Sequence, residues 1–130
     1  MISCYIKIRQ HIVARSLKWK ISKNRLTDAF IALYAHREIN RIPIKAITDL
    51  AGVNRATFYI YYDDVYDLRE QIETYFLEKM AGIINRLDFM DVEKLFSEII
   101  ALYQSSGDYL PILLGRDGSP FPGRVKAVMR

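Results

Sequence analysis

Residues 54–62, NRATFYIYY, combine an arginine with hydroxyl-bearing side chains at spacings that suit contact with a nucleic acid. An arginine can form a bidentate pair with guanine, a threonine offers a methyl group or a hydroxyl, and a small alanine permits close approach to a base. A tyrosine can rest its ring on a hydrophobic core and direct its hydroxyl at a phosphate. The candidate contact residues are therefore Asn54, Arg55, Ala56, Thr57, Tyr59 and Tyr61.

Among the tyrosines of this stretch, Tyr59 is the first candidate for a phosphate contact and Tyr61 the second. Tyr62 lies four residues after Phe58, on the same side of a helix, and is assigned with it to the core. The alternative for the whole stretch is a packed pair of helices on which Arg55 is an ordinary surface residue.

Two short helices must position these side chains. Apolar residues repeat at i, i+3 and i+7 within 44–51 and predict a helix there. Gly52 follows, where a helix can end in the left-handed conformation at little cost only with glycine. Asn54 is a good N-cap for a second helix over 54–61. Two helices joined by such a turn fit the helix-turn-helix arrangement, whose second helix lies in the major groove of DNA.

Helical spacing of apolar residues continues through most of the chain, and no strand pattern is evident. Four further helices are expected, over about 22–38 (with Ser22 as N-cap), 64–87, 92–103 and 109–115. A loop is expected over the glycine- and proline-rich 115–123, after which 124–130 begin another helix. The predicted fold is all-α: a three-helix head with a helix-turn-helix, a long connecting fourth helix and a partial helical C-terminal domain.

The charge of the chain is divided unevenly. Residues 1–62 hold eleven Lys and Arg against three acids, a net charge of +8, whereas the remainder holds eight against twelve, a net charge of −4. Such asymmetry suggests that the first half binds a polyanion. The first 25 residues contain seven Lys and Arg and no acid. They suit an arm that enters the minor groove, or a terminus without fixed structure, which we favour.

Several classes of protein are disfavoured by the composition. No apolar run approaches the roughly 20 residues that a membrane span needs, so a soluble, cytoplasmic protein is expected. Cys4 is the sole cysteine, which excludes an internal disulfide and a cysteine-based zinc site. The two histidines, His11 and His36, have no partner at a catalytic or metal-binding spacing. Acids cluster at helix starts, where capping and the helix dipole explain them. We expect no enzyme activity, no metal and no cofactor.

The segment AGVNRATFYIYYDDVYDL, preceded by IKAITDL and LTDAFIALYAHR, resembles the N-terminal DNA-binding domain of the TetR family of bacterial transcriptional regulators. The resemblance covers about 22–76. By position it implies base contacts from Arg55, Ala56 and Thr57 and phosphate contacts from Tyr59 and Tyr61. It adds a contact to the DNA backbone from Lys45. The implied organisation is a basic extension over 1–21, the DNA-binding domain over 22–76, and the start of an effector and dimerisation domain over 77–130.

The chain departs from the family pattern at several points. Pro43 replaces the usual capping threonine of the helix over 44–51, and Thr48 occupies a position that is usually small and apolar. Asp63, Asp64 and Val65 stand where the family usually has a lysine at the start of the fourth helix, and the two acids would repel a phosphate that they faced. Family members also carry further C-terminal helices that form the dimer interface. We therefore expect either a fragment or a shortened protein that dimerises in another way.

The resemblance implies a regulator, a repressor by expectation, that binds a palindromic DNA operator as a homodimer and holds a small effector in its C-terminal domain. Candidate residues of an effector pocket are Tyr75, Phe76, Phe96, Ile99, Tyr103 and Leu113. The same residues would make a good hydrophobic core, and their helical period favours that interpretation. The alternative function is a helical adaptor that binds only other proteins.

Overall fold

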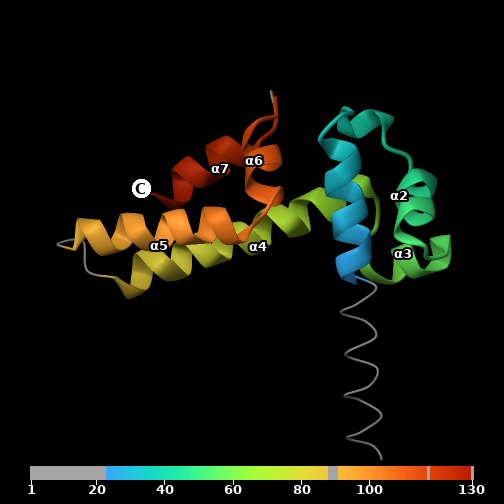
Figure 1. Ribbon diagram of the computed structural model, residues 1–130. Helices are drawn as coiled ribbons and strands as arrows, with labels where there is room; N and C mark the ends of the chain where they lie inside the picture. Colours follow the sequence, from blue (N-terminus) through green and yellow to red (C-terminus); the bar gives the residue numbers. More distant parts are fainter. Residues whose placement is uncertain (1–22, 88–90, 117, 130) are drawn as a thin grey trace, which may run out of the picture. The chain divides into compact units, whose positions relative to one another are not determined.

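The computed structural model describes residues 23–87, 91–116 and 118–129. All regular structure in these ranges is helical and none of it is a strand (Figure 1), which confirms the all-α prediction. The chain divides into two compact units, with the boundary between Val65 and Tyr66. The predicted domain boundary at 76/77 falls inside the second unit. The basic extension over 1–21 and the predicted cap Ser22 lie outside the described residues.

The first helix of the head occupies 23–34, so it ends four residues before the predicted limit of 38. Its apolar face is buried as expected at Leu26, Phe30 and Tyr34, with the rings of Phe30 and Tyr34 stacked 5.0 Å apart. A turn and the 3-10 helix η1 (Ile39–Arg41) follow. Ile42, which follows η1, is only 3% exposed and belongs to the core.

Helices α2 (Ile44–Ala51) and α3 (Arg55–Tyr61) contact each other and match the predicted ranges to within one residue. Pro43 occupies the N-cap position of α2 with an extended backbone and no side-chain cap. Thr48 is buried in α2, where its hydroxyl donates to the carbonyl oxygens of Ile44 and Lys45 at 3.2 and 3.1 Å. This backbone bonding satisfies a hydroxyl at an otherwise apolar position.

The second unit contains nearly all of α4 (Val65–Arg86), which confirms the predicted long helix. Helix α5 (Val92–Ser105) begins at an N-cap, Asp91, whose carboxylate accepts the amide proton of Lys94 at 3.1 Å. Figure 1 shows α5 running alongside α4. Within this unit the ring of Phe76 on α4 lies 6.0 Å from that of Tyr109, the first residue of α6 (Tyr109–Leu114).

Helix α7 (Phe121–Val128) contacts α6 and corrects the predicted loop over 115–123, because three of those residues are helical. Pro122 lies in the first turn, where a missing amide proton removes no helical hydrogen bond. Phe121 is fully buried and anchors the start of the helix. The loop is therefore shorter than its glycines and prolines indicated, since burial of one aromatic residue favours helix there.

Candidate nucleic-acid interface

The turn between α2 and α3 reverses the chain within three residues. Gly52 has φ 71° and ψ 32°, in the left-handed region that a residue with a Cβ adopts only with strain. The amide of Val53 donates to the carbonyl oxygen of Thr48 at 3.1 Å, which satisfies one of the last carbonyl groups of α2. This closed turn holds the start of α3 against the end of α2.

Asn54 caps α3 as the sequence predicted. Its side-chain oxygen accepts from the amide of Thr57 at 2.9 Å and from the Thr57 hydroxyl at 3.0 Å. Thr57 is also half-buried. The hydroxyl proton of Thr57 is thus engaged inside the cap, and what this residue offers outward is its methyl group and its oxygen lone pairs. Asn54 is itself exposed.

The solvent-facing side of α3 consists of Arg55, Ala56, Tyr59 and Ile60, all exposed. The guanidinium carbon of Arg55 lies over the ring of Tyr59, 6.0 Å from its centre. The same ring meets the buried ring of Phe58 edge-on, with centroids 5.6 Å apart. Tyr59 therefore rests on the core by one edge of its ring while half of its surface stays open, at 50% exposure.

The inward side of α3 is anchored by aromatic residues. Phe58 is fully buried and Tyr62, the C-terminal neighbour of α3, is 2% exposed, with ring centroids 5.5 Å apart. This confirms the assignment of Tyr62 to the core. Tyr61 is half-buried, and its ring lies 6.2 Å from that of Tyr62. Of the two tyrosines predicted to face phosphate, Tyr59 is thus the more exposed. Lys45 is exposed near the start of α2.

Ile60 is the residue of this face that the sequence reasoning missed. It is 71% exposed, the largest fraction among the exposed large hydrophobic residues of the described ranges. A signal for it was present, because Ile60 lies four residues after Ala56 and two after Phe58. At about 100° per residue, the first spacing places it with Ala56 and the second places it away from the core.

Comparisons with known proteins add nothing to this geometry. No family model, curated protein or solved structure matches the chain. The resemblance of 22–76 to TetR heads therefore stays a prediction from the sequence.

Two exposed acids, Asp63 and Asp64, follow α3 directly. Their negative charge makes the C-terminal end of α3 unfavourable for a phosphate group. The N-terminal end of the same helix carries the cation Arg55 and the positive end of the helix dipole. A bound polyanion would therefore place its charged groups away from Asp63 and Asp64.

The six residues predicted for an effector pocket are distributed over several environments in the second unit. Phe76 and Leu113 are buried and Ile99 is half-buried. Tyr75, Phe96 and Tyr103 are exposed by 54%, 59% and 45%, respectively. Phe96 and Tyr103 belong to a row of exposed apolar side chains along α5 that also includes Val92 and Ile100. The predicted set thus combines core positions with surface positions.

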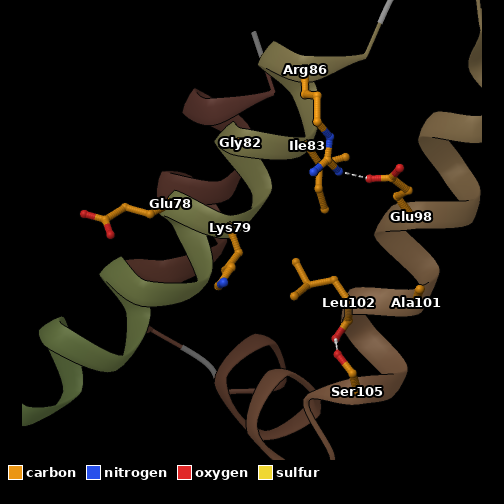
Figure 2. A pocket seen from close by; sticks show the side chains of 9 residues that line it. All are labelled: Glu78, Lys79, Gly82, Ile83, Arg86, Glu98, Ala101, Leu102 and Ser105. Atoms are coloured by element: carbon orange, nitrogen blue, oxygen red, sulfur yellow. Dashed lines mark hydrogen bonds and ion pairs between the residues drawn. The ribbon is translucent and has the colours of Figure 1, made fainter.

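A groove of about 560 Å³ runs between α4 and α5 and contains none of those six residues. Figure 2 shows Lys79 and Leu102 directed into it and Arg86 reaching across to form an ion pair with Glu98, while Glu78 points away from α5. The groove is lined by Glu78, Lys79, Gly82, Ile83, Arg86, Glu98, Ala101, Leu102 and Ser105. Its wall is thus half polar, unlike the apolar pocket that was predicted.

A buried carboxylate joins α4 to α7. Glu73 is 1% exposed and lies between two arginines, with Oε2 3.3 Å from Nη1 of Arg124 and Oε1 3.4 Å from Nε of Arg69. Arg124 also donates to the hydroxyl of Thr74 at 3.1 Å. Burial raises the pKa of the Glu73 carboxyl above its ordinary value, although both arginine charges lower it.

Other kinds of site find little support in the described ranges. No three His, Cys, Asp or Glu side chains there come together as metal ligands would. His36 is exposed, and His11 lies outside the described residues. No helix in the part of the chain that the structure describes combines the length and the apolar character needed to cross a bilayer.

Proposed function

We propose that this chain is a DNA-binding transcriptional regulator that inserts α3 into the major groove. The observation that carries the proposal is the division of α3 into two faces. Phe58 and Tyr62 anchor one face in the core, while Arg55 and its neighbours present hydrogen-bonding and small apolar groups to the outside. Such a helix, held by a tight glycine turn at the end of α2, suits a groove about 12 Å wide.

Most of the residues predicted from the sequence receive a role in this proposal. Arg55 pairs with a guanine edge, and Ala56 lets the helix approach the bases closely. Tyr59 directs its hydroxyl at a phosphate while its ring is supported by Phe58. Lys45, exposed on α2, contacts the DNA backbone. The methyl group of Thr57 and the amide nitrogen of Asn54 reach toward base edges from the helix start.

The TetR resemblance extends the proposal to the whole regulator. A homodimer binds a palindromic operator, with one head on each half-site, and represses transcription. A small effector releases it by binding to the second unit. The groove between α4 and α5, at about 560 Å³, is within the usual size range of roughly 300–1,000 Å³ for such ligands.

Selection from a random duplex pool tests the proposal. The full chain should enrich a palindrome, and its affinity should fall steeply with salt, because each neutralised phosphate contributes a slope of about −0.9 in log K against log salt. Lys45→Ala should reduce that slope by about one phosphate contact. Lys126→Ala removes an exposed cation from α7 and is the matched control, with no expected change.

The adaptor alternative makes the opposite prediction. A folded chain that enriches no sequence, and whose residual binding to duplex DNA is the same for Lys45→Ala and Lys126→Ala, would refute DNA recognition through α2 and α3. In that case the exposed face of α3 would be a surface for another protein.

A further inference from the structure

The exposed face of α3 contains two strips of different chemistry. The first strip consists of Arg55 and Tyr59, whose side chains end in polar groups. The guanidinium group of Arg55 lies over the ring of Tyr59. Ala56 and Ile60 form the other, which is wholly apolar, and both are exposed. Residues four apart on a helix lie one above the other, so each strip runs along the helix axis.

Ile60 is 71% exposed, so its apolar side chain is available to contact an apolar group of a ligand. In the major groove only thymine offers one, since the C5 methyl group is the single apolar feature among the base edges. We infer that Ile60, together with Ala56, accepts a thymine methyl group and selects an A·T pair in each half-site. This inference rests on the proposed function and specifies which base the second strip reads.

The charges near Ile60 favour a base contact over a backbone contact. Asp63 and Asp64 are exposed and follow within four residues, so a phosphate placed at this end of α3 would be repelled. A base methyl group is uncharged and loses little by lying near these carboxylates. The apolar strip therefore faces the groove floor, while the phosphates lie away from the two carboxylates.

The helix geometry predicts where the thymine lies relative to the guanine read by Arg55. Ile60 follows Arg55 by five residues, about 7.5 Å along the axis at roughly 1.5 Å per residue. One base-pair step is about 3.4 Å along the duplex. The thymine should therefore be two or three base-pair steps from that guanine in each half-site.

The test replaces single thymines of the selected operator by deoxyuridine, which removes only the C5 methyl group. For the wild-type chain, deoxyuridine at one position in each half-site should lower affinity by about three- to fivefold, the value for one buried methyl group. Ile60→Ala should bind the thymine operator more weakly than the wild type does. It should bind the thymine operator and the deoxyuridine operator with equal affinity. Ile60→Val should keep a reduced preference for thymine.

Leu50→Ala is the matched control, because Leu50 is an exposed apolar residue of the same unit, at 57%, but lies on α2. For Leu50→Ala, replacing the selected thymine by deoxyuridine should lower the affinity by as much as it does for the wild type. Thermal melts should show Ile60→Ala folded, since the side chain is mostly exposed.

The outcomes separate this inference from the proposed function. A chain that selects no duplex overturns the proposed function and the inference together. Selection of an operator whose uridine forms bind as tightly as the thymine form overturns the inference alone. So does an Ile60→Ala variant that keeps the wild-type uridine effect.

Discussion

At the scale of single residues, the guanidinium group of Arg55, the proposed base contact, lies over the ring of Tyr59, the proposed phosphate contact. Arg55→Ala should lose about 1–3 kcal/mol on the operator and relax the preference at one base pair, with little change on random DNA. Tyr59→Phe keeps the ring and deletes one hydroxyl, so it should weaken both DNAs alike, by about 0.5–1.5 kcal/mol. Fluorescence anisotropy with operator and scrambled duplexes measures both.

The pattern across the two duplexes decides the assignment. An equal loss on both DNAs for Arg55→Ala would show that the guanidinium group contacts phosphate. A loss confined to the operator for Tyr59→Phe would assign the hydroxyl to a base.

Tyr62 tests the opposite role, that of a core aromatic residue. It is 2% exposed and packs against Phe58, so Tyr62→Ala should destabilise the head by about 3–5 kcal/mol. Tyr59→Ala truncates a half-exposed ring of the same helix and should be much less destabilising, by about 1 kcal/mol. Urea unfolding followed by circular dichroism measures both variants. Equal destabilisation by the two would contradict the division of α3 into an inner and an outer face.

Glu73 makes stability depend on pH through its burial. Its folded pKa is raised above the ordinary value of 4.5, so between these values the folded chain binds more protons than the unfolded chain. The contribution of this carboxyl to the free energy of unfolding therefore falls as pH rises through that window. The stability of the wild type relative to Glu73→Gln should decline as pH increases from 4 toward neutral.

Urea unfolding of both proteins across that range measures the difference. A wild-type advantage that grows with pH would mean that attraction to Arg69 and Arg124 outweighs the burial of the carboxylate.

At the scale of elements, the α2–α3 pair depends on the conformation of Gly52. A Cβ there would meet no atom within 4 Å, so Gly52→Ala is disfavoured only by the positive φ of 71°. The expected loss of stability is about 1–2 kcal/mol, and Gly52→Asn should lose less. Gly82→Ala is a matched control that should change the stability in the opposite direction. This glycine lies within α4, with open space around it, and alanine should stabilise a helix interior by up to about 1 kcal/mol.

Thermal unfolding of the three variants distinguishes backbone strain from other effects. If Gly52→Ala left the thermal stability unchanged, the turn would open without loss of stability. The rigid presentation of α3 would then have no support.

At the scale of the whole molecule, the proposed regulator requires two heads on one face of the duplex. Half-site centres should be about 34–36 Å apart or a multiple of that distance, because half-sites must repeat with the helical turn. Inserting about 5 bp between them turns one half-site to the opposite face and should abolish joint binding, whereas about 10 bp should restore much of it. Sedimentation of the complex should give two chains per operator. One chain bound per palindrome, with an affinity unaffected by either insertion, would contradict the dimer.

Local sequence signals were sufficient for the fold class and for the elements of the candidate site. The apolar period of α2, the glycine after it and the asparagine cap of α3 act over at most a few residues, so their outcome does not depend on the rest of the chain. The four-residue spacing between Phe58 and Tyr62 predicted the burial of Tyr62. Helical spacing of apolar residues predicted the long α4 as well.

Tertiary packing decided what local patterns left open. The start of α7 at Phe121 overrode a local loop signal because that ring is buried. Arg124 and Glu73 are separated by 51 positions, a pairing that no local period can indicate. Periodicity assigns a residue to one side of its own helix. Whether that side is covered or exposed is determined by distant parts of the chain.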